Sequence, residues 1–462
     1  MYTLNVFLLF LGRFTMKKDQ QVVRNMKHKF LHAGITMALA AGMMATLPSA
    51  YAGGKITIDD TKWISIGMGM RGGFAAASSR ATNGGYGNQF GLNNARIYLN
   101  GQIHENIKFE FNTESFNVGN TAGGTGTGNT AGYGSGFAQT SGIGILDAIA
   151  KFEFNRYVNL WAGRMLVPTE RGELNGPFYH ATFEGFKTPY FPQDFSGNVQ
   201  KTGAAVAGSG MYGRDNGVTF FGDIDTKDQV GLGHLQYSMG VFTGTRGGGS
   251  GGPNLSDSAS YAGRLTYNFL NPEKNPGYYT SGTYYGTAGD ILAVAVGVNH
   301  QKNGAGSYNH RTDFTGVVAD VLFEKVLDNN MGVFTFNGEY KRFWASGGTA
   351  STVAQRTIMF ADSTSFSQFS GQSWTAYGLY LIPHKVGIGR FQPYGRYTSI
   401  QPEMSGNRTE AEGGMNYVID GHNARLAAFF QRGNLYTTGL NYAPGVTGAT
   451  INAFKVAFQL QI

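Results

Sequence analysis

Apolar and polar residues alternate along the last stretch of the chain. Every second position carries a bulky apolar residue, namely Phe454, Val456, Phe458, Leu460 and Ile462, and the residues between them are small or polar. A period of two places these two sets on opposite faces of a β-strand. A strand at the edge of an open sheet leaves backbone hydrogen-bonding groups unpaired. We therefore expect the first strand to pair with this last one and to close the sheet into a barrel.

The same alternation recurs from residue 63 onwards. Short turns alternate with long loops rich in Gly, Ser, Thr and Asn, which is typical of transmembrane β-barrels. The pattern predicts an all-β fold, a transmembrane antiparallel β-barrel of about sixteen strands. A hairpin hidden in the Tyr-rich stretch 271–289 would raise the number to eighteen, which is also even, as such barrels require. The predicted strands are 63–74, 94–103, 107–116, 143–154, 158–167, 216–224, 232–243, 260–269, 291–301, 313–323, 332–344, 373–382, 391–400, 409–419, 424–431 and 450–462.

The composition also favours many short strands. The 462 residues include 70 Gly, 34 Phe, 25 Tyr and 4 Trp, and only 14% are charged, which fits neither a disordered chain nor a helical one. No apolar run reaches the roughly 18 to 20 residues that a spanning helix needs, whereas a barrel hides its apolar half in alternation. The absence of Cys suits a chain that crosses an oxidising compartment.

The first 52 residues read as an N-terminal extension and a signal peptide. Met26–Lys29 form a basic region, 34–47 an apolar one, and Ala50 and Ala52 supply the small residues of a cleavage site before Gly53. We expect 53–462 to be a single barrel domain. Six of the 36 basic and one of the 29 acidic residues lie in the leader, which leaves 30 basic and 28 acidic residues. The net charge of +7 therefore falls to +2, and the case for a nucleic-acid partner falls with it.

Motifs for enzymatic or cofactor chemistry lack their structural context. Residues 67–72 fit G-x-G-x-x-G but lie inside a strand with no helix after it, so no nucleotide site is expected. The histidines are scattered without metal-ligand spacing, and no Ser/His/acid set falls on adjacent strand ends. Asp223, Asp225 and Asp228 form either a calcium site or, as we favour, a turn whose aspartates cap their own backbone. We expect no catalytic residues, no cofactor and no metal.

The connection 169–210 is the longest loop and is rich in aromatic residues. Aromatic residues argue against disorder, and structureless loops of this length in compact domains are usually functional or disordered. We expect this third external loop to fold into the lumen and constrict it. Its candidate constriction residues are Arg171, Glu173, Lys187, Asp194 and Lys201.

Strand alternation turns a set of charged residues inward. The pentapeptide Lys-Phe-Glu-Phe-Asn occurs twice, at 108–112 and 151–155, on two neighbouring antiparallel strands. We favour mutual neutralisation of its charges on a wet wall over a segment that polarises permeating ions. The candidate channel-lining residues are Arg71, Arg96, Lys108, Glu110, Lys151, Glu153, Arg264, Arg396, Arg425 and Lys455.

The chain resembles the phosphate-selective porin (porin O and P) family of outer-membrane β-barrels. The residues that carry the resemblance are 95–101 (Ala-Arg-Ile-Tyr-Leu-Asn-Gly), 109–114 (Phe-Glu-Phe-Asn-Thr-Glu), Asp147-Ala148, Ala162-Gly163-Arg164 and Pro168. The resemblance implies sixteen strands, a homotrimer, an in-folded third external loop and a lumen of Arg and Lys that passes anions. The last strand, 454–462, is similar to the final strand of bacterial porins, which implies a role as the signal read by the barrel-assembly machinery. Leu166 stands where the family commonly has Lys.

Together these features predict an outer-membrane porin of a Gram-negative bacterium. We expect passive diffusion of small hydrophilic solutes, with a preference for phosphate-like anions. The expected partners are outer-membrane lipid, the barrel-assembly machinery and small inorganic anions or other small polar solutes, with no nucleic acid. Two alternatives remain open: a plugged barrel that acts as a scaffold or binding partner, and an outer-membrane enzyme.

Overall fold

The computed structural model describes residues 54–79, 81, 83–118, 143–187, 213–226, 233–245, 254–306, 311–345, 369–435 and 445–462. Residues 50–462 form one compact unit and residues 1–49 another, and only the first of these is described below. The expected leader and its cleavage site lie outside the described residues. The signal peptide therefore stays a prediction.

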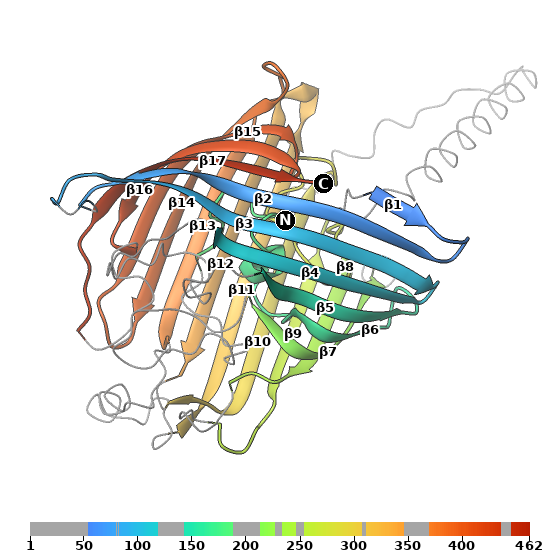
Figure 1. Ribbon diagram of the computed structural model, residues 1–462. Coiled ribbons are helices and arrows are strands. Elements are labelled where there is room, and N and C mark those ends of the chain that lie inside the picture. The colour runs from blue at the N-terminus through green and yellow to red at the C-terminus, as the bar shows by residue number, and fades with distance from the viewer. Residues whose placement is uncertain are drawn as a thin grey trace, which may run out of the picture. The chain divides into compact units, whose positions relative to one another are not determined.

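A single antiparallel sheet closes on itself (Figure 1). Each strand from β2 to β17 pairs with the next, and β17 pairs back with β2, so these sixteen strands form a closed barrel. The strands are β1 (Gly54–Thr57), β2 (Trp63–Ala77), β3 (Gly87–His104), β4 (Ile107–Val118), β5 (Ile143–Glu153), β6 (Asn159–Leu166), β7 (Arg214–Asp225), β8 (His234–Phe242), β9 (Ser260–Asn268), β10 (Ile291–Gly306), β11 (Arg311–Leu327), β12 (Gly332–Trp344), β13 (Gly371–Leu381), β14 (Arg390–Pro402), β15 (Arg408–Asp420), β16 (Ala424–Gly433) and β17 (Ile451–Gln461).

All sixteen predicted strands are confirmed. The sequence pattern missed only β1, a short strand that pairs with Trp63–Ile66 of β2, on the edge of β2 that β17 occupies further along. At the junction the backbone groups of Met68 and Ile462 exchange two hydrogen bonds, 3.0 and 2.8 Å long. The last residue of the chain is thus held on the first barrel strand.

The eighteen-strand alternative is wrong, because the connection between β9 and β10 contains no hairpin. Residues 271–289 lack the apolar–polar alternation of a strand, and several of them take left-handed backbone conformations, among them Tyr285 (φ 53°) and Gly286 (φ 81°). This connection turns into the lumen instead of extending the sheet.

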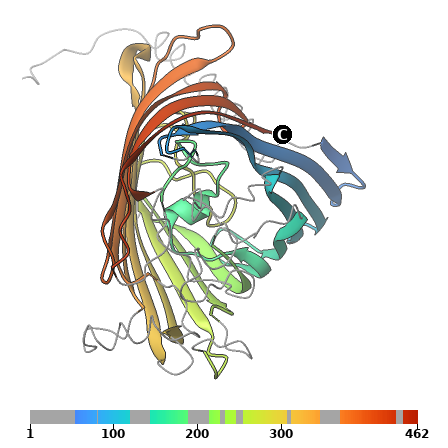
Figure 2. The same cartoon turned by 60° about the vertical axis from the view of Figure 1, so that its left-hand side comes forward.

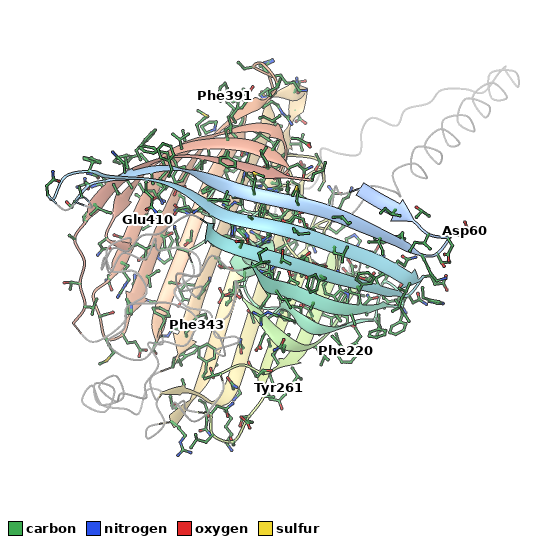
Figure 3. The ribbon with its side chains drawn as sticks, in the orientation of Figure 1. Asp60, Phe220, Tyr261, Phe343, Phe391 and Glu410 are labelled. Carbon is green, nitrogen blue, oxygen red and sulfur yellow. The ribbon has the colours of Figure 1, made fainter. Side chains whose placement is uncertain are left out.

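The two faces of the barrel have opposite character. On β17 the side chains of Phe454, Val456 and Leu460 are 44–47% exposed, whereas Gln459 is fully buried, as the alternation predicts. Exposed apolar side chains elsewhere on the outer face include Phe220 and Tyr261 (Figure 3). The outside of the barrel is therefore apolar and the inside polar, the reverse of a soluble sandwich.

No helix in the described part of the chain is long and apolar enough to span a membrane.

The barrel has two ends that differ in their connections. At the terminal end, where β2 begins and β17 ends, most of the described connections are short, such as the turns at 105–106 and 421–423 and the 3-10 helix η2 (Asp328–Asn330). The connection 269–290 is the long exception at this end. At the opposite, far end, β6 leads into a loop that returns inside the ring of strands, where Figure 2 shows its green ribbon.

Candidate pore and its constriction

The described part of the third far-end loop, residues 167–187, lies inside the lumen. It contains α2 (Arg171–Asn175), a single helical turn whose five residues are all buried. The chain continues past α2 along the inner wall to Lys187, and Phe178 and Phe186 are also fully buried. The predicted in-folded loop is confirmed for these residues, whereas Asp194 and Lys201 lie outside the described part.

Wall arginines bind the backbone carbonyls of this loop. Arg425 of β16 donates to the carbonyl oxygens of His180 (2.6 Å) and Ala181 (3.0 Å), and Arg396 of β14 donates to that of Gly185 (2.5 Å). Arg71 of β2 donates to the carbonyl of Phe183. Carbonyls of an irregular loop have no ladder partner, so buried ones need donors of this kind. These three predicted channel-lining arginines therefore also hold the loop against the wall.

Two amide side chains add to these contacts. Gln459 of β17 donates from Nε2 to the carbonyl of Phe178 (2.8 Å), and Asn416 of β15 donates from Nδ2 to that of Ala181 (3.0 Å). The donors thus come from β2 and from β14 to β17, which are consecutive in the closed sheet. The loop is fastened along one continuous part of the wall.

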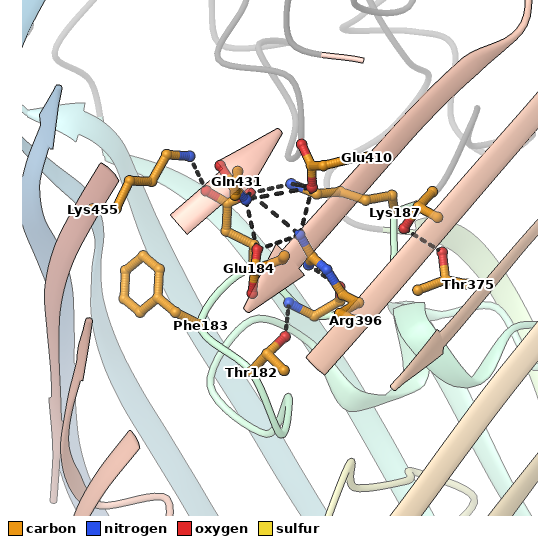
Figure 4. A network of polar contacts seen from close by, with 12 residues as sticks. Thr182, Phe183, Glu184, Lys187, Thr375, Arg396, Glu410, Gln431 and Lys455 are labelled. Carbon is orange, nitrogen blue, oxygen red and sulfur yellow. Dashed lines mark hydrogen bonds and ion pairs between the residues drawn. The ribbon is translucent and has the colours of Figure 1, made fainter. Parts of the chain in front are cut away.

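A compact ionic cluster surrounds Glu184 (Figure 4). Its carboxylate pairs with Lys187 and with Lys455 of β17. Arg396 pairs with Glu410 (2.6 Å) and Glu412 (2.5 Å) of β15, and the oxygens of the three carboxylates lie within 4.8 Å of one another. Three nearby cations neutralise the three carboxylates.

The protonation of Glu184 follows from this setting. Burial by itself would raise the pKa of its carboxyl, but Lys187, Lys455 and Arg396 outweigh burial and hold the pKa well below its ordinary value. Glu184 is therefore ionised, and its charge ties the loop to β17.

A second acidic group near α2 has too few cations. Lys341 of β12 pairs with Glu170 and with Glu339 (3.0 Å), while Glu173 adds a third carboxyl. Burial first, and then the neighbouring carboxylates Glu170 and Glu339, raise the pKa of Glu173 well above its ordinary value. Burial also raises the pKa of Glu170. Retained protons keep this group close to neutral.

A chain of four charged side chains joins the β9–β11 wall to the inserted loop and to the connection 269–290. Arg264 of β9 pairs with Asp320 of β11, with contacts of 2.5 and 2.9 Å. Asp320 also accepts from Nε of Arg171 (2.8 Å), and the terminal nitrogens of Arg171 bind both carboxylate oxygens of Glu273 (2.9 and 2.5 Å). Two cations alternate with two anions, so the chain is neutral.

The terminal-end connection 269–290 packs into the lumen as well. The carboxylate of Glu324 on β11 accepts from Thr283 Oγ1 (2.6 Å) and from the backbone N–H groups of Tyr284 (3.0 Å) and Gly286 (2.8 Å). Tyr278 is buried against Trp161 of β6, with ring centroids 5.3 Å apart. The inserted connection is therefore fixed by the barrel wall at two separate places.

His422, in the turn between β15 and β16, also holds this connection. Its Nε2 lies 2.9 Å from the carbonyl oxygen of Thr283 and 3.0 Å from Ser281 Oγ. Burial, followed by the charge of Arg425, lowers the pKa of His422 to about 3. The ring is therefore neutral at physiological pH and donates its Nε2 proton to the Thr283 carbonyl.

The duplicated pentapeptide behaves as predicted. Lys108 and Lys151 face each other in register on β4 and β5, and each pairs with a glutamate of the repeat: Lys108 with Glu153 at 2.6 Å, and Lys151 with Glu110. All four charges are therefore neutralised locally, which agrees with the favoured interpretation of the repeat.

Other predicted acidic positions are also paired. Asp223 and Asp225, which were expected in a self-capping turn or a calcium site, lie instead at the end of β7, where they pair with Arg156 at 2.8 and 3.7 Å, while Asp228 lies outside the described residues. Several of the charged residues that meet in the lumen were not among the predicted site residues. They are Glu273, Asp320, Glu324 and Arg214, which carry no local sequence signal because their partners lie far away in the sequence.

A small cavity lies between the β3–β5 wall and the two inserted connections. Its volume is about 50 Å³, and its wall side is lined by Arg96, Glu110 and Asp147, with Arg214 of β7 beside them. Arg214 pairs with Asp147 (2.9 Å). A buried water needs at least about 10–15 Å³ by this kind of measure, so the cavity holds only a few waters.

No family model matches the chain, and no curated protein matches it. Among solved structures it is similar to the outer-membrane expressed OmpT of Vibrio cholerae (10% identity, TM-score 0.47, 88% of this chain and 100% of that chain). It is also similar to the anion-selective porin from Comamonas acidovorans (12%, 0.47, 87% and 100%) and to Salmonella typhi OmpF in complex with daunomycin (12%, 0.49, 88% and 100%). At such identities and scores these likenesses carry no argument about function. Membership of the phosphate-selective porin family stays a prediction.

Proposed function

We propose that this protein is an outer-membrane porin of a Gram-negative bacterium, a passive diffusion channel for small hydrophilic solutes. The observation that carries the proposal is the closed sixteen-stranded barrel with an apolar outer face and a charged lumen into which a loop folds. An apolar outer face is what contact with lipid requires, and a charged inner face is what a water-filled path requires. In this arrangement the terminal end faces the periplasm and the far end the exterior.

A preference for anions is the finer part of the proposal. Most described lumen cations have carboxylate partners, which cancels their charge locally. Arg425 is an exception to this pattern, because the acceptors bonded to its guanidinium are the carbonyls of His180 and Ala181 and the amide oxygen of Gln459, all of them neutral. An uncancelled charge in a narrow, low-dielectric passage acts on permeating ions far more than it would in bulk water. We infer that Arg425 is the main source of any anion bias, including a bias toward phosphate.

Planar-bilayer recordings test both parts of this proposal. Purified protein should give discrete conductance steps, with a reversal potential in a salt gradient that indicates anion preference. Arg425→Gln should shift the reversal potential toward cation preference, whereas Arg432→Gln, on the exposed face of the same strand, should not. Arg425→Lys keeps the charge and loses the forked contacts with the loop. If the charge of Arg425 sets the selectivity, only Arg425→Gln should shift the reversal potential. If the contacts with the loop set it, both variants should shift the reversal potential.

A reversal potential that is the same in wild type and in Arg425→Gln would remove the case for anion selectivity while leaving the pore intact. Protein that inserts but gives no conductance steps would contradict the porin itself. That second result would favour the plugged barrel, for which the supporting observation is the neutral chain of charged side chains that links the wall, the inserted loop and the connection 269–290.

The assembly partners follow from the same proposal. The last strand presents an apolar outer row that ends at Ile462, which is 63% exposed. We infer that the barrel-assembly machinery reads this strand and that the mature protein forms a homotrimer. Cross-linking of the native outer membrane and the mass of the extracted, unheated complex test the trimer.

A further inference from the structure

Segment 269–290 enters the lumen from the terminal end and meets loop 167–187, which enters from the far end. The backbone N–H of Gly282 donates to the carbonyl of Tyr179 (2.8 Å), and Thr280 Oγ1 donates to Asn175 Oδ1 (2.6 Å). The backbone N–H of Thr280 donates to the carbonyl of Leu174 (3.4 Å). The two inserted connections therefore form one packed body, although they come from opposite ends of the barrel.

One ion pair joins the two connections at their contact. Arg171 and Glu273 form a bidentate pair, with side chains 0% and 6% exposed, and the hydroxyl of Tyr284 also donates to Glu273 (2.9 Å). Bidentate arginine–carboxylate pairs are directional as well as strong. Removal of Arg171 leaves the Glu273 carboxylate buried without its counter-ion, which is strongly unfavourable, and removal of Glu273 leaves Arg171 with Asp320, a counter-ion that Arg264 shares. This pair therefore holds segment 269–290 against the loop.

The same segment forms one side of the cavity next to β3–β5. Asn275, Pro276 and Tyr279 line that cavity opposite Arg96 and Asp147. If the segment were absent, this side of the cavity would be open toward the terminal end. With the segment in place the cavity is about 50 Å³, which is enough for a few waters.

We propose that segment 269–290 is a second constriction of the pore, entered from the periplasmic end, and that the Arg171–Glu273 pair fixes its position. It narrows the periplasmic part of the path and so lowers the size of the solutes that can pass. The inference rests on the proposed porin function and adds the element that sets the size limit. Arg171 and Glu273 act through the position of the segment, so they are positioning residues.

Single-channel conductance of five proteins tests this assignment. The first is the wild type, and the second replaces residues 274–287 with a short Gly-Ser linker. The third is Glu273→Gln, which removes the charge and preserves the side-chain size. The matched control is Asp223→Asn, which breaks a partly exposed arginine–aspartate pair at the same end of the barrel but outside segment 269–290. A fifth protein, from which residues 173–186 of the far-end loop are deleted, reports on the first constriction.

We expect severalfold higher conductance and passage of larger solutes, such as small sugars, in the linker variant. Glu273→Gln should show frequent transitions to a larger conductance level, and Asp223→Asn should match the wild type. The inference is overturned if the linker variant folds, as judged by heat-modifiable mobility, and conducts like the wild type while the loop deletion conducts more. If none of the five proteins conducts, the proposed porin function is contradicted, and this inference is contradicted as well.

A thiol probe keeps the test decisive if the linker variant does not fold. The chain has no Cys, so Asn275→Cys introduces a unique thiol. A small charged methanethiosulfonate added on the periplasmic side should reduce the current through Asn275→Cys and leave the wild type unaffected. Unchanged current through fully labelled protein, with labelling verified by mass spectrometry, would show that the segment does not border the conducting path.

Discussion

The loss of stability caused by an arginine on the outer face of β17 indicates how deep that position lies in the membrane. Val456 occupies the middle of the strand and is 44% exposed, whereas Ile462 ends the chain and is 63% exposed. Six residues separate them, which is about 20 Å along a strand at ~3.4 Å per residue. With a strand tilt of about 45° this becomes ~14 Å along the membrane normal, slightly more than half of an apolar band about 25 Å tall.

The two positions should therefore respond very differently. Arginine on the lipid face costs about 2–4 kcal/mol at the midplane and about 0–1 kcal/mol near the interface. Val456→Arg should lower the free energy of unfolding by the larger amount and Ile462→Arg by the smaller one, while Val456→Leu should leave it nearly unchanged. The assay is urea-dependent folding into lipid vesicles, which needs no assembly machinery. Equal losses at both positions, or no loss at Val456, would refute the assignment of the outer face and of the strand centre.

Three further predictions concern the lumen and its wall. A group whose pKa is raised in the folded state contributes stability that is lost as pH rises. The free energy of unfolding should therefore fall between pH 4.5 and the raised pKa of Glu173. In Glu173→Gln this fall should be smaller. His422 has the opposite sign, since its pKa is lowered to about 3: stability should fall as pH drops below about 6.5, and His422→Gln should weaken this loss in the same titration. Gly163→Ala should destabilise the barrel by at least about 1–3 kcal/mol, because Gly163 has φ 130° and an added Cβ would lie 2.1 Å from the carbonyl oxygen of Ala148. A wild-type unfolding midpoint in the Gly163→Ala variant would contradict the strain at that position.

The strands of this barrel were predictable because their signal is local. Alternation with a period of two depends only on neighbouring residues, and a barrel wall with lipid on one side and a wet lumen on the other imposes it at every strand. The same pattern correctly placed Arg71, Arg264 and Arg396 on the inner face, where all three are buried. The orientation of a side chain was therefore predictable where contact with lipid or water determines it, and not where one particular partner residue does.

The inserted connections were only half predictable. The aromatic content of 169–210 indicated a loop folded into the lumen, which is confirmed for the described part, 169–187, yet the similarly Tyr-rich stretch 271–289 was open to interpretation as a hairpin. The position of this segment in the lumen depends on contacts with Glu324, Arg171 and His422, which are distant from it in the sequence. The sequence pattern of the segment itself does not predict these contacts.

The charge of the lumen is a poor guide to selectivity for the same reason. A loop without regular secondary structure carries carbonyls that must find donors once it is buried, and a barrel wall can supply those donors only from side chains. Arginine presents five N–H groups on one rigid plane, so it suits this task as well as it suits an anion. Arg425 shows both uses at once, because it holds two loop carbonyls and retains a charge that they do not cancel. Arg396 holds a carbonyl too, but Glu410 and Glu412 cancel its charge. Ion preference in this barrel therefore depends on which arginines have carboxylate partners, and not on how many arginines face the lumen.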